Sequence, residues 1–158
     1  MTALPPDLDF AVRTARTAGA LAMRWFQSAE LVADGKADGS PVTQADREAE
    51  RLVRDEIQRA FPDDGVIGEE FPEKPSRNGR VWVVDPIDGT RSFVQGVPLF
   101  GTMLALLVDG LPDTGVVYMP GLDECVGARL GAGCWWWPSG SAEPRRAEVT
   151  DHAEIRGC

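Results

Sequence analysis

Two carboxylates at positions 85 and 88 stand directly after an apolar run in this sequence. The run Val81–Val84 carries β-branched or aromatic side chains without alternation, which predicts a strand covered on both faces. Pro86 is expected to end that strand, so that Asp85, Asp88 and the carbonyl of Ile87 lie on a turn at the end of a sheet. Oxygen ligands of this kind suit Mg²⁺. The stretch predicts a magnesium site; the alternative is an Asp-Pro-x-Asp-Gly turn whose acids only cap backbone N–H groups.

The residues after this turn predict a phosphate site beside the cation. Gly89 and Thr90 follow Asp88 at once, and Arg91–Val94 is expected to open a helix. Free N–H groups at a helix N-terminus bind phosphate. The same short stretch is therefore expected to face both a divalent cation and an anionic substrate.

The order Asp-Pro-Ile-Asp-Gly-Thr at residues 85–90 resembles the signature of the inositol monophosphatase family, the Mg²⁺-dependent, lithium-sensitive phosphatases of small molecules. Two upstream motifs agree with it and come in the family's order. Gly68-Glu69-Glu70 is similar to the family's first metal-binding motif, and residues 36–46 (KADGSPVTQAD) are similar to its N-terminal loop and helix start. The longer stretch 85–102 is more similar to the histidinol-phosphatase-like branch than to the inositol phosphatases.

The resemblance implies a role for each residue of these motifs. The implied metal ligands are Glu69, Asp85, Ile87 and Asp88, arranged around two Mg²⁺ ions about 3.5–4 Å apart. The implied catalytic residues are Thr90, Asp46 and Glu69. The implied substrate contacts are Gly89, Thr90, Asp88 and Lys36. In this scheme Asp46 holds Thr90, which orients an attacking water, and the N–H groups of Gly89 and Thr90 hold the phosphate.

Three of these implied roles, those of Glu69, Asp46 and Lys36, have a simpler alternative. Adjacent glutamates such as Glu69 and Glu70 are usually solvated surface. Asp46 is expected in the first turn of a helix, where a carboxylate meets the helix dipole favourably, and this is compatible with its implied role. Lys36 lies in a turn-rich polar loop, residues 34–41, for which mobility is the simpler interpretation.

The composition is that of a soluble globular protein of one domain's size. The chain has 158 residues, of which 43% are hydrophobic and 26% charged. Its net charge of −9 argues against nucleic acid or an anionic membrane as a partner. No apolar run approaches a membrane span and the first residues lack signal-peptide features, so we expect a cytoplasmic location.

Histidine and cysteine usage narrows the chemistry further. With a single histidine, His152, a histidine-based triad or a multi-histidine metal site is set aside. The cysteines lack zinc-ligand spacing and are expected to be reduced thiols; they are Cys125, Cys134 and Cys158.

Periodicity predicts the elements that position the motifs. Apolar positions recur at three and four over residues 7–27 and 44–61, which predicts two amphipathic helices, the second capped by Thr43. Short apolar segments predict strands at 66–68, 81–84, 101–108, 115–119 and 124–130. The triplet Trp135–Trp137 is expected to pack on the edge of the sheet or on a second copy of the chain.

The predicted fold class is α+β, with two N-terminal helices packed on a largely antiparallel sheet, as in the first half of the inositol monophosphatase fold. Residues 1–146 are expected to form this metal- and phosphate-binding half, and residues 147–158 the start of a second α/β half. Because family members continue well past this length, we expect a truncated member with an incomplete second metal site. Its exposed core edge makes a homo-oligomer a further expectation.

The predicted function is hydrolysis of a small phosphorylated metabolite with Mg²⁺ as cofactor. Histidinol phosphate is the favoured substrate, and inositol 1-phosphate or a related sugar phosphate is the alternative. The alternative of a different class is a catalytically impaired fragment that only binds metal or phosphate, or associates with a partner.

Overall fold

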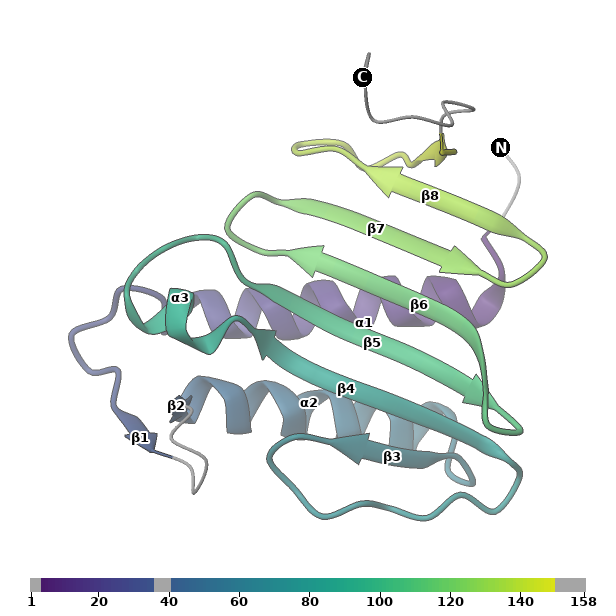
Figure 1. Ribbon diagram of the computed structural model, residues 1–158, viewed down its shortest axis with the longest axis horizontal. Coiled ribbons are helices and arrows are strands. Elements are labelled where there is room, and N and C mark those ends of the chain that lie inside the picture. The colour runs from purple at the N-terminus through teal and green to yellow at the C-terminus, as the bar shows by residue number, and fades with distance from the viewer. Residues whose placement is uncertain (1–3, 36–40, 150–158) are drawn as a thin grey trace.

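A computed structural model describes residues 4–35 and 41–149 of the chain. Two long helices, α1 (Pro6–Met23) and α2 (Gln44–Ala60), lie on one face of a sheet that has seven strands in the described residues (Figure 1). A small two-stranded sheet, β1 (Ala33–Gly35) with β2 (Pro41–Thr43), precedes α2. The predicted α+β class, with two helices on a sheet, is confirmed.

The strands of the large sheet lie side by side in chain order. They are β3 (Gly65–Gly68), β4 (Arg80–Asp88), β5 (Gly101–Val108), β6 (Leu111–Met119), β7 (Glu124–Arg129), β8 (Gly133–Trp137) and β9 (Arg145–Ala147). All neighbouring pairs are antiparallel except β3 and β4, where Gly68 lies opposite Val84. Because parallel strands end at the same edge of a sheet, the residues that follow Gly68 and Val84 come together there.

The helix limits follow from local signals at their ends. α1 begins with Pro6 in its first turn, where a missing N–H costs nothing. It ends at Met23, four residues before the predicted end, where the N–H groups of Arg24 and Trp25 bond to the carbonyl oxygens of Leu21 and Ala22, three residues back instead of four. α2 begins as predicted, with the Thr43 side chain accepting the N–H groups of Ala45 and Asp46.

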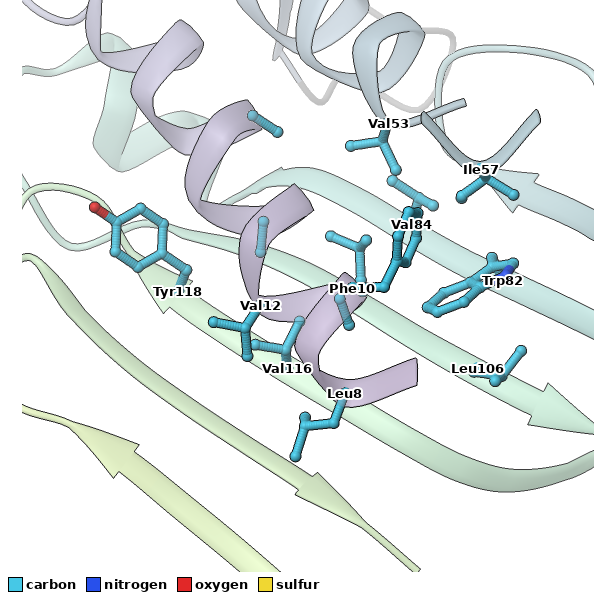
Figure 2. Close-up of a cluster of buried hydrophobic side chains, with 14 of the residues drawn as sticks. Leu8, Phe10, Val12, Val53, Ile57, Trp82, Val84, Leu106, Val116 and Tyr118 are labelled. Carbon is cyan, nitrogen blue, oxygen red and sulfur yellow. The ribbon is translucent and has the colours of Figure 1, made fainter. Parts of the chain in front are cut away.

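The core lies between the helices and the sheet (Figure 2). Trp82 of β4 is fully buried, and its ring meets Phe10 of α1 at a centroid distance of 5.3 Å and Phe61 at 5.8 Å. Val53 and Ile57 of α2 are also fully buried in this cluster. Each such side chain contributes about 1.5–3 kcal/mol by leaving water, so β4 and α2 are held in a fixed relation.

The central strand β4 corrects two predictions. Burial alternates along it: Trp82 and Val84 are buried, whereas Val81 and Val83 are half-buried. Side chains of a strand point alternately to its two faces, and within the described residues helices cover only one of them (Figure 1). The prediction of a strand covered on both faces was therefore wrong for this part of the chain.

Pro86 does not end the strand. β4 continues to Asp88, with an irregularity of register against β5 between Asp85 and Asp88. A proline is tolerated at such a bulge because no ladder N–H is needed there. The carbonyl oxygen of Pro86 instead accepts a hydrogen bond from the hydroxyl of Thr102, at 2.9 Å.

The triplet Trp135–Trp137 lies in β8, one strand inside the edge strand β9. Trp137 is buried in the core, and the guanidinium of Arg146 lies 4.4 Å from the centre of the Trp135 ring. The triplet is thus part of the sheet itself, with Trp137 buried and Trp135 and Trp136 half-buried. The predicted boundary after residue 146 falls within β9, and the division into 1–146 and 147–158 stays a prediction because residues 150–158 lie outside the described ones.

No helix within residues 4–35 and 41–149 combines the length and the apolar character needed to cross a bilayer.

Candidate active site

Four chain segments meet at one end of the large sheet: the C-terminal ends of β3 and β4, the first turn of α2, and the short helix α3 (Thr90–Val94) (Figure 1). Glu69 follows β3, and the parallel pairing of Gly68 with Val84 sets it beside Asp85. Asp46 lies in the first turn of α2. Thr90 opens α3 directly after the end of β4. Residues separated by up to 44 positions in the sequence are thereby gathered at one place.

Asp85 carries the clearest signature of a cation site. Its Oδ1 is buried and has no hydrogen-bond partner among the described residues. Burial raises the pKa of Asp85 to about 7, and the negative charges of Glu69, Asp88 and Asp46 add to that rise. A carboxylate that is desolvated beside other carboxylates is unfavourable alone and is stabilised when a cation binds.

Asp46 is buried and joins the start of α2 to the start of α3. Its Oδ2 accepts the backbone N–H of Thr43 at 2.8 Å and the Thr43 hydroxyl at 2.6 Å, which completes a reciprocal capping box. Its Oδ1 lies 3.3 Å from the hydroxyl oxygen of Thr90, which donates to it. Burial raises the pKa of Asp46, although the hydrogen bonds from Thr43 and Thr90 act in the opposite direction.

The Thr90 hydroxyl lies between two acceptors. Besides Asp46 it contacts the carbonyl oxygen of Ile87 at 3.0 Å. A threonine hydroxyl has one hydrogen to donate and two lone pairs that accept, so it can serve one of these acceptors fully and still accept a bond from a water. Gly89, the residue before α3, has a φ of 90°, a conformation that favours glycine, and it turns the chain from β4 into α3.

The residues present fit a magnesium ion, although they do not form a closed cage. No group of three His, Cys, Asp or Glu side chains within the described ranges is arranged to hold a metal by itself. Glu69 and Asp88 are exposed to solvent. Mg²⁺ keeps several waters and commonly uses one or two carboxylates together with substrate phosphate. The unpartnered oxygen of Asp85, next to two further carboxylates, meets that requirement.

All predicted site residues within the described ranges come together here; Lys36 lies outside those ranges, so its predicted role stays a prediction. Sequence reasoning missed Glu50 and Arg54, which hold the backbone after Glu69. The signal that could have found Glu50 is its spacing of four residues from Asp46, which places both acids on one face of α2.

An α+β protein with a cluster of carboxylates at adjacent strand ends is the class that this fold and site define. The profile of the Inositol monophosphatase family matches residues 4–156, and the chain belongs to that family. A histidinol-phosphatase of Chlorobaculum parvum is 50% identical over 132 residues, which cover 84% of this chain and 51% of that protein. A histidinol-phosphatase of Mycobacterium tuberculosis is 44% identical over 152 residues, covering 96% and 58%.

Solved structures agree with this membership. The extragenic suppressor protein suhB of Bartonella henselae superposes with a TM-score of 0.84 at 31% identity, covering 94% of this chain and 56% of that one. The Thermotoga maritima IMPase gives a TM-score of 0.78 at 36% identity, with the same coverage of 94% and 56%. The chain thus spans about half the length of the relatives it matches.

Proposed function

We propose that this chain provides the metal- and phosphate-binding part of a Mg²⁺-dependent phosphate monoesterase, with histidinol phosphate as the first substrate to test. The observation that carries the proposal is the buried, unpartnered Oδ1 of Asp85 beside Glu69 and Asp88. The names of the relatives favour histidinol phosphate among the substrates. Inositol 1-phosphate is the alternative, since a Rhizobium meliloti inositol-1-monophosphatase is 40% identical over 110 residues.

The metal would be held by Asp85, Glu69, Asp88 and the carbonyl of Ile87. When bound, Mg²⁺ supplies positive charge that offsets the charge of the phosphate ester and of the departing alkoxide. The N–H groups of Gly89 and Thr90, at the turn into α3, are proposed to hold the phosphate oxygens.

The chain's own proton chemistry is assigned to Thr90 and Asp46. In this scheme the Thr90 hydrogen is directed to Asp46 and not to the Ile87 carbonyl, which is assigned to the metal. The lone pairs of the Thr90 oxygen are then left to orient a water for attack on phosphorus in line with the leaving oxygen. Asp46 is fixed on its other side by Thr43 and therefore holds the Thr90 hydroxyl in one orientation. As the water attacks, its proton passes to the Thr90 oxygen while the Thr90 hydrogen passes to Asp46, which later releases it to solvent, and the departing alkoxide takes up a proton from solvent water. No covalent intermediate is needed in this scheme.

The test is phosphate release by the purified chain from histidinol phosphate and, side by side, inositol 1-phosphate. Each substrate is given with Mg²⁺, without it, and with Mg²⁺ plus a chelator. We expect release from histidinol phosphate that requires the metal and falls by orders of magnitude in Asp88→Asn, which stays folded because Asp88 is exposed. Turnover in Asp88→Asn at the level of the unmodified chain would overturn the residue assignment.

A binding function without turnover is the second candidate. The specific observation in its favour is that Glu69 and Asp88 are exposed to solvent, so the described residues leave the metal side of the site open to water and do not enclose a substrate. Calorimetric titration with Mg²⁺, read together with the phosphate-release assay, separates the two candidates. Metal binding without phosphate release from either substrate would favour the binding function.

We also propose that the protein acts in the cytoplasm on a small phosphorylated metabolite. Cys125 and Cys134 are free thiols, as is usual for proteins of a reducing compartment. Burial raises the pKa of Cys125 to about 11, so this thiol is protonated and unreactive at neutral pH.

A further inference from the structure

Glu50 of α2 is a buried carboxylate that the proposed reaction does not use. Its side chain has no exposed surface. Its Oε2 accepts the backbone N–H of Glu70 at 2.7 Å, and its Oε1 accepts the Nε of Arg54, one helical turn further on, at 2.7 Å. A buried charge is tolerated only when it is paired and hydrogen-bonded, and Glu50 meets both conditions through these contacts.

Arg54 attaches the next residue of the same segment, Phe71, to α2. Its Nη2 donates to the carbonyl oxygen of Phe71 at 3.0 Å, and its guanidinium lies 5.7 Å from the centre of the Phe71 ring. The guanidinium of Arg51 approaches the same ring at 5.3 Å. The backbone just after Glu69 is therefore held on α2 through an N–H on one residue and a carbonyl and a ring on the next.

Gly68, the residue before Glu69, packs directly against the Glu50 carboxylate. A Cβ at Gly68 would overlap the Glu50 carboxyl group, so only glycine lets β3 come this close to α2. Glu69 is thus bracketed by Gly68 and Glu70, and both of these neighbours contact Glu50. Because both neighbours are held against Glu50, the backbone of Glu69 has little freedom to move away from Asp85.

α2 serves both sides of the site through one face. Asp46 in its first turn holds Thr90, and Glu50 one turn later holds the segment of Glu69. Thr90 follows β4 and Glu69 follows β3. Because both are held by the same helix, their positions relative to each other are fixed by α2.

We propose that Glu50, paired with Arg54, is a positioning residue that sets Glu69 against Asp85 for cation binding. The inference rests on the proposed function, in which Glu69 and Asp85 face the metal. Glu50 touches neither metal nor substrate in this assignment. Residues that orient metal ligands from behind typically change metal affinity by 10- to 100-fold when they are altered.

The test measures Mg²⁺ binding by calorimetry on the whole chain without substrate. Glu50→Gln keeps an oxygen for the Glu70 N–H but removes the charge that holds Arg54, and we expect about a tenfold weaker Mg²⁺ affinity. The matched control is Glu56→Gln, a partly exposed glutamate of the same helix paired with Arg59, which should leave the affinity unchanged. In turnover assays the Mg²⁺ concentration for half-maximal rate should rise in Glu50→Gln while kcat at saturating Mg²⁺ stays near that of the unmodified chain.

A second variant covers the case in which Glu50→Gln does not fold. Gly68→Ala leaves every charge in place but pushes a methyl group into the Glu50 carboxylate, and it should weaken Mg²⁺ binding to a similar degree. If either folded variant binds Mg²⁺ as tightly as the unmodified chain, Glu50 only supports the fold and the inference is wrong.

Asp85→Asn, titrated in parallel, separates this inference from the proposed function. Mg²⁺ affinity that depends on Asp85 but not on Glu50 overturns the positioning role alone. Affinity that is independent of Asp85, or no binding by the unmodified chain, overturns both.

Discussion

The hydroxyl of Thr90 lies 3.3 Å from the carboxylate of Asp46, although 44 residues of chain separate them. The contact joins the first turn of α2 to the first residue of α3. It exists because Asp46 is already held on its other oxygen by Thr43, so its free oxygen has one direction in which to accept. A helix cap formed far away in the sequence therefore presents Thr90 with an acceptor besides the Ile87 carbonyl, which lies 3.0 Å from the same hydroxyl.

Asp46→Asn tests this orientation. The amide oxygen can keep both bonds from Thr43, but the amide nitrogen then faces Thr90 and cannot accept its hydrogen. We expect the melting temperature to change little and phosphate release to fall by about 100-fold or more. Asp55→Asn, an exposed acid on the same helix, is the control and should change neither quantity. Turnover in Asp46→Asn equal to that of the control would show that Thr90 does not need this acceptor.

The raised pKa of Asp85 predicts how stability depends on pH. Its carboxyl has a pKa of about 7 in the folded chain, against 3.8 in the absence of the fold, so the folded state holds a proton between these values that the unfolded state has lost. The free energy of unfolding of the metal-free chain should therefore fall, by a few kcal/mol, as the pH rises from about 4 to about 7.

Urea unfolding at a series of pH values with a chelator present measures this fall. Asp85→Asn should flatten it and should be more stable than the unmodified chain at pH values near 8. Mg²⁺ at about 100 times its Kd should restore about 2.7 kcal/mol to the unmodified chain at the same pH. A metal-free chain that gains stability between these pH values would contradict the assignment of a buried, destabilised carboxylate.

The buried carboxylate of Asp64 accepts several hydrogen bonds at the end of the sheet opposite the candidate site. It accepts hydrogen bonds from Trp82 Nε1 at 2.9 Å, Asn78 Nδ2 at 2.7 Å and Arg80 Nε at 3.1 Å. Asp64→Ala leaves these donors without their acceptor and should cost about 3 kcal/mol of stability, since Arg80 keeps its second partner Asp7.

Its neighbour provides the control. Asp63 is exposed, and its side chain approaches Arg77 only at 3.9 Å, so Asp63→Ala should change the free energy of unfolding by less than about 0.5 kcal/mol. Equal losses of unfolding free energy for Asp64→Ala and Asp63→Ala in chemical denaturation would show that the hydrogen bonds to Asp64 add no more stability than an exposed acid does.

Gly89→Ala separates backbone strain from site geometry. Gly89 and Gly110 have φ values of 90° and 80°, and alanine at either should cost about 1–2 kcal/mol. A Cβ at Gly110 meets no atom within 4 Å, whereas at Gly89 it would lie 3.3 Å from the carbonyl oxygen of Leu99. We expect similar losses of stability but a loss of turnover only in Gly89→Ala. If Gly110→Ala lost as much turnover, overall destabilisation and not the turn at Gly89 would be the cause.

Much of this arrangement could be predicted because local signals and distant packing agree. The α2 start was predicted at Thr43 because cap chemistry is local, and the β5 bounds because an apolar run between two turns has no competing interpretation. The course of β4 past Pro86 could not be predicted, because it depends on the Thr102 hydroxyl and a change of register in a neighbouring strand. The burial of only one face of β4 likewise depends on which elements pack there.

The candidate site likewise contains residues that the sequence indicates and residues whose role only the structure reveals. Asp85 and Asp88 stand out in the sequence because they follow a continuous apolar run directly and are joined at once by Gly89 and Thr90. Glu50 does not, because a glutamate in a polar helix is ordinary until β3 is seen against it. Its spacing of four residues from Asp46 places both acids on one face of α2, but its contact with Gly68 depends on how β3 packs against that face.

The capped first turn of α2 has a consequence for how this end of the molecule moves. Helix ends normally fray, but here Thr43 and Ala45 are fully buried and Asp46 is 2% exposed. Their amides should exchange with deuterium as slowly as those in the middle of the helix, because exposing them would require the Thr43, Asp46 and Thr90 contacts to open together. We therefore expect the end of α2 that carries Asp46 to be among the rigid parts of the described chain, so that any closure around a substrate has to come from segments outside it.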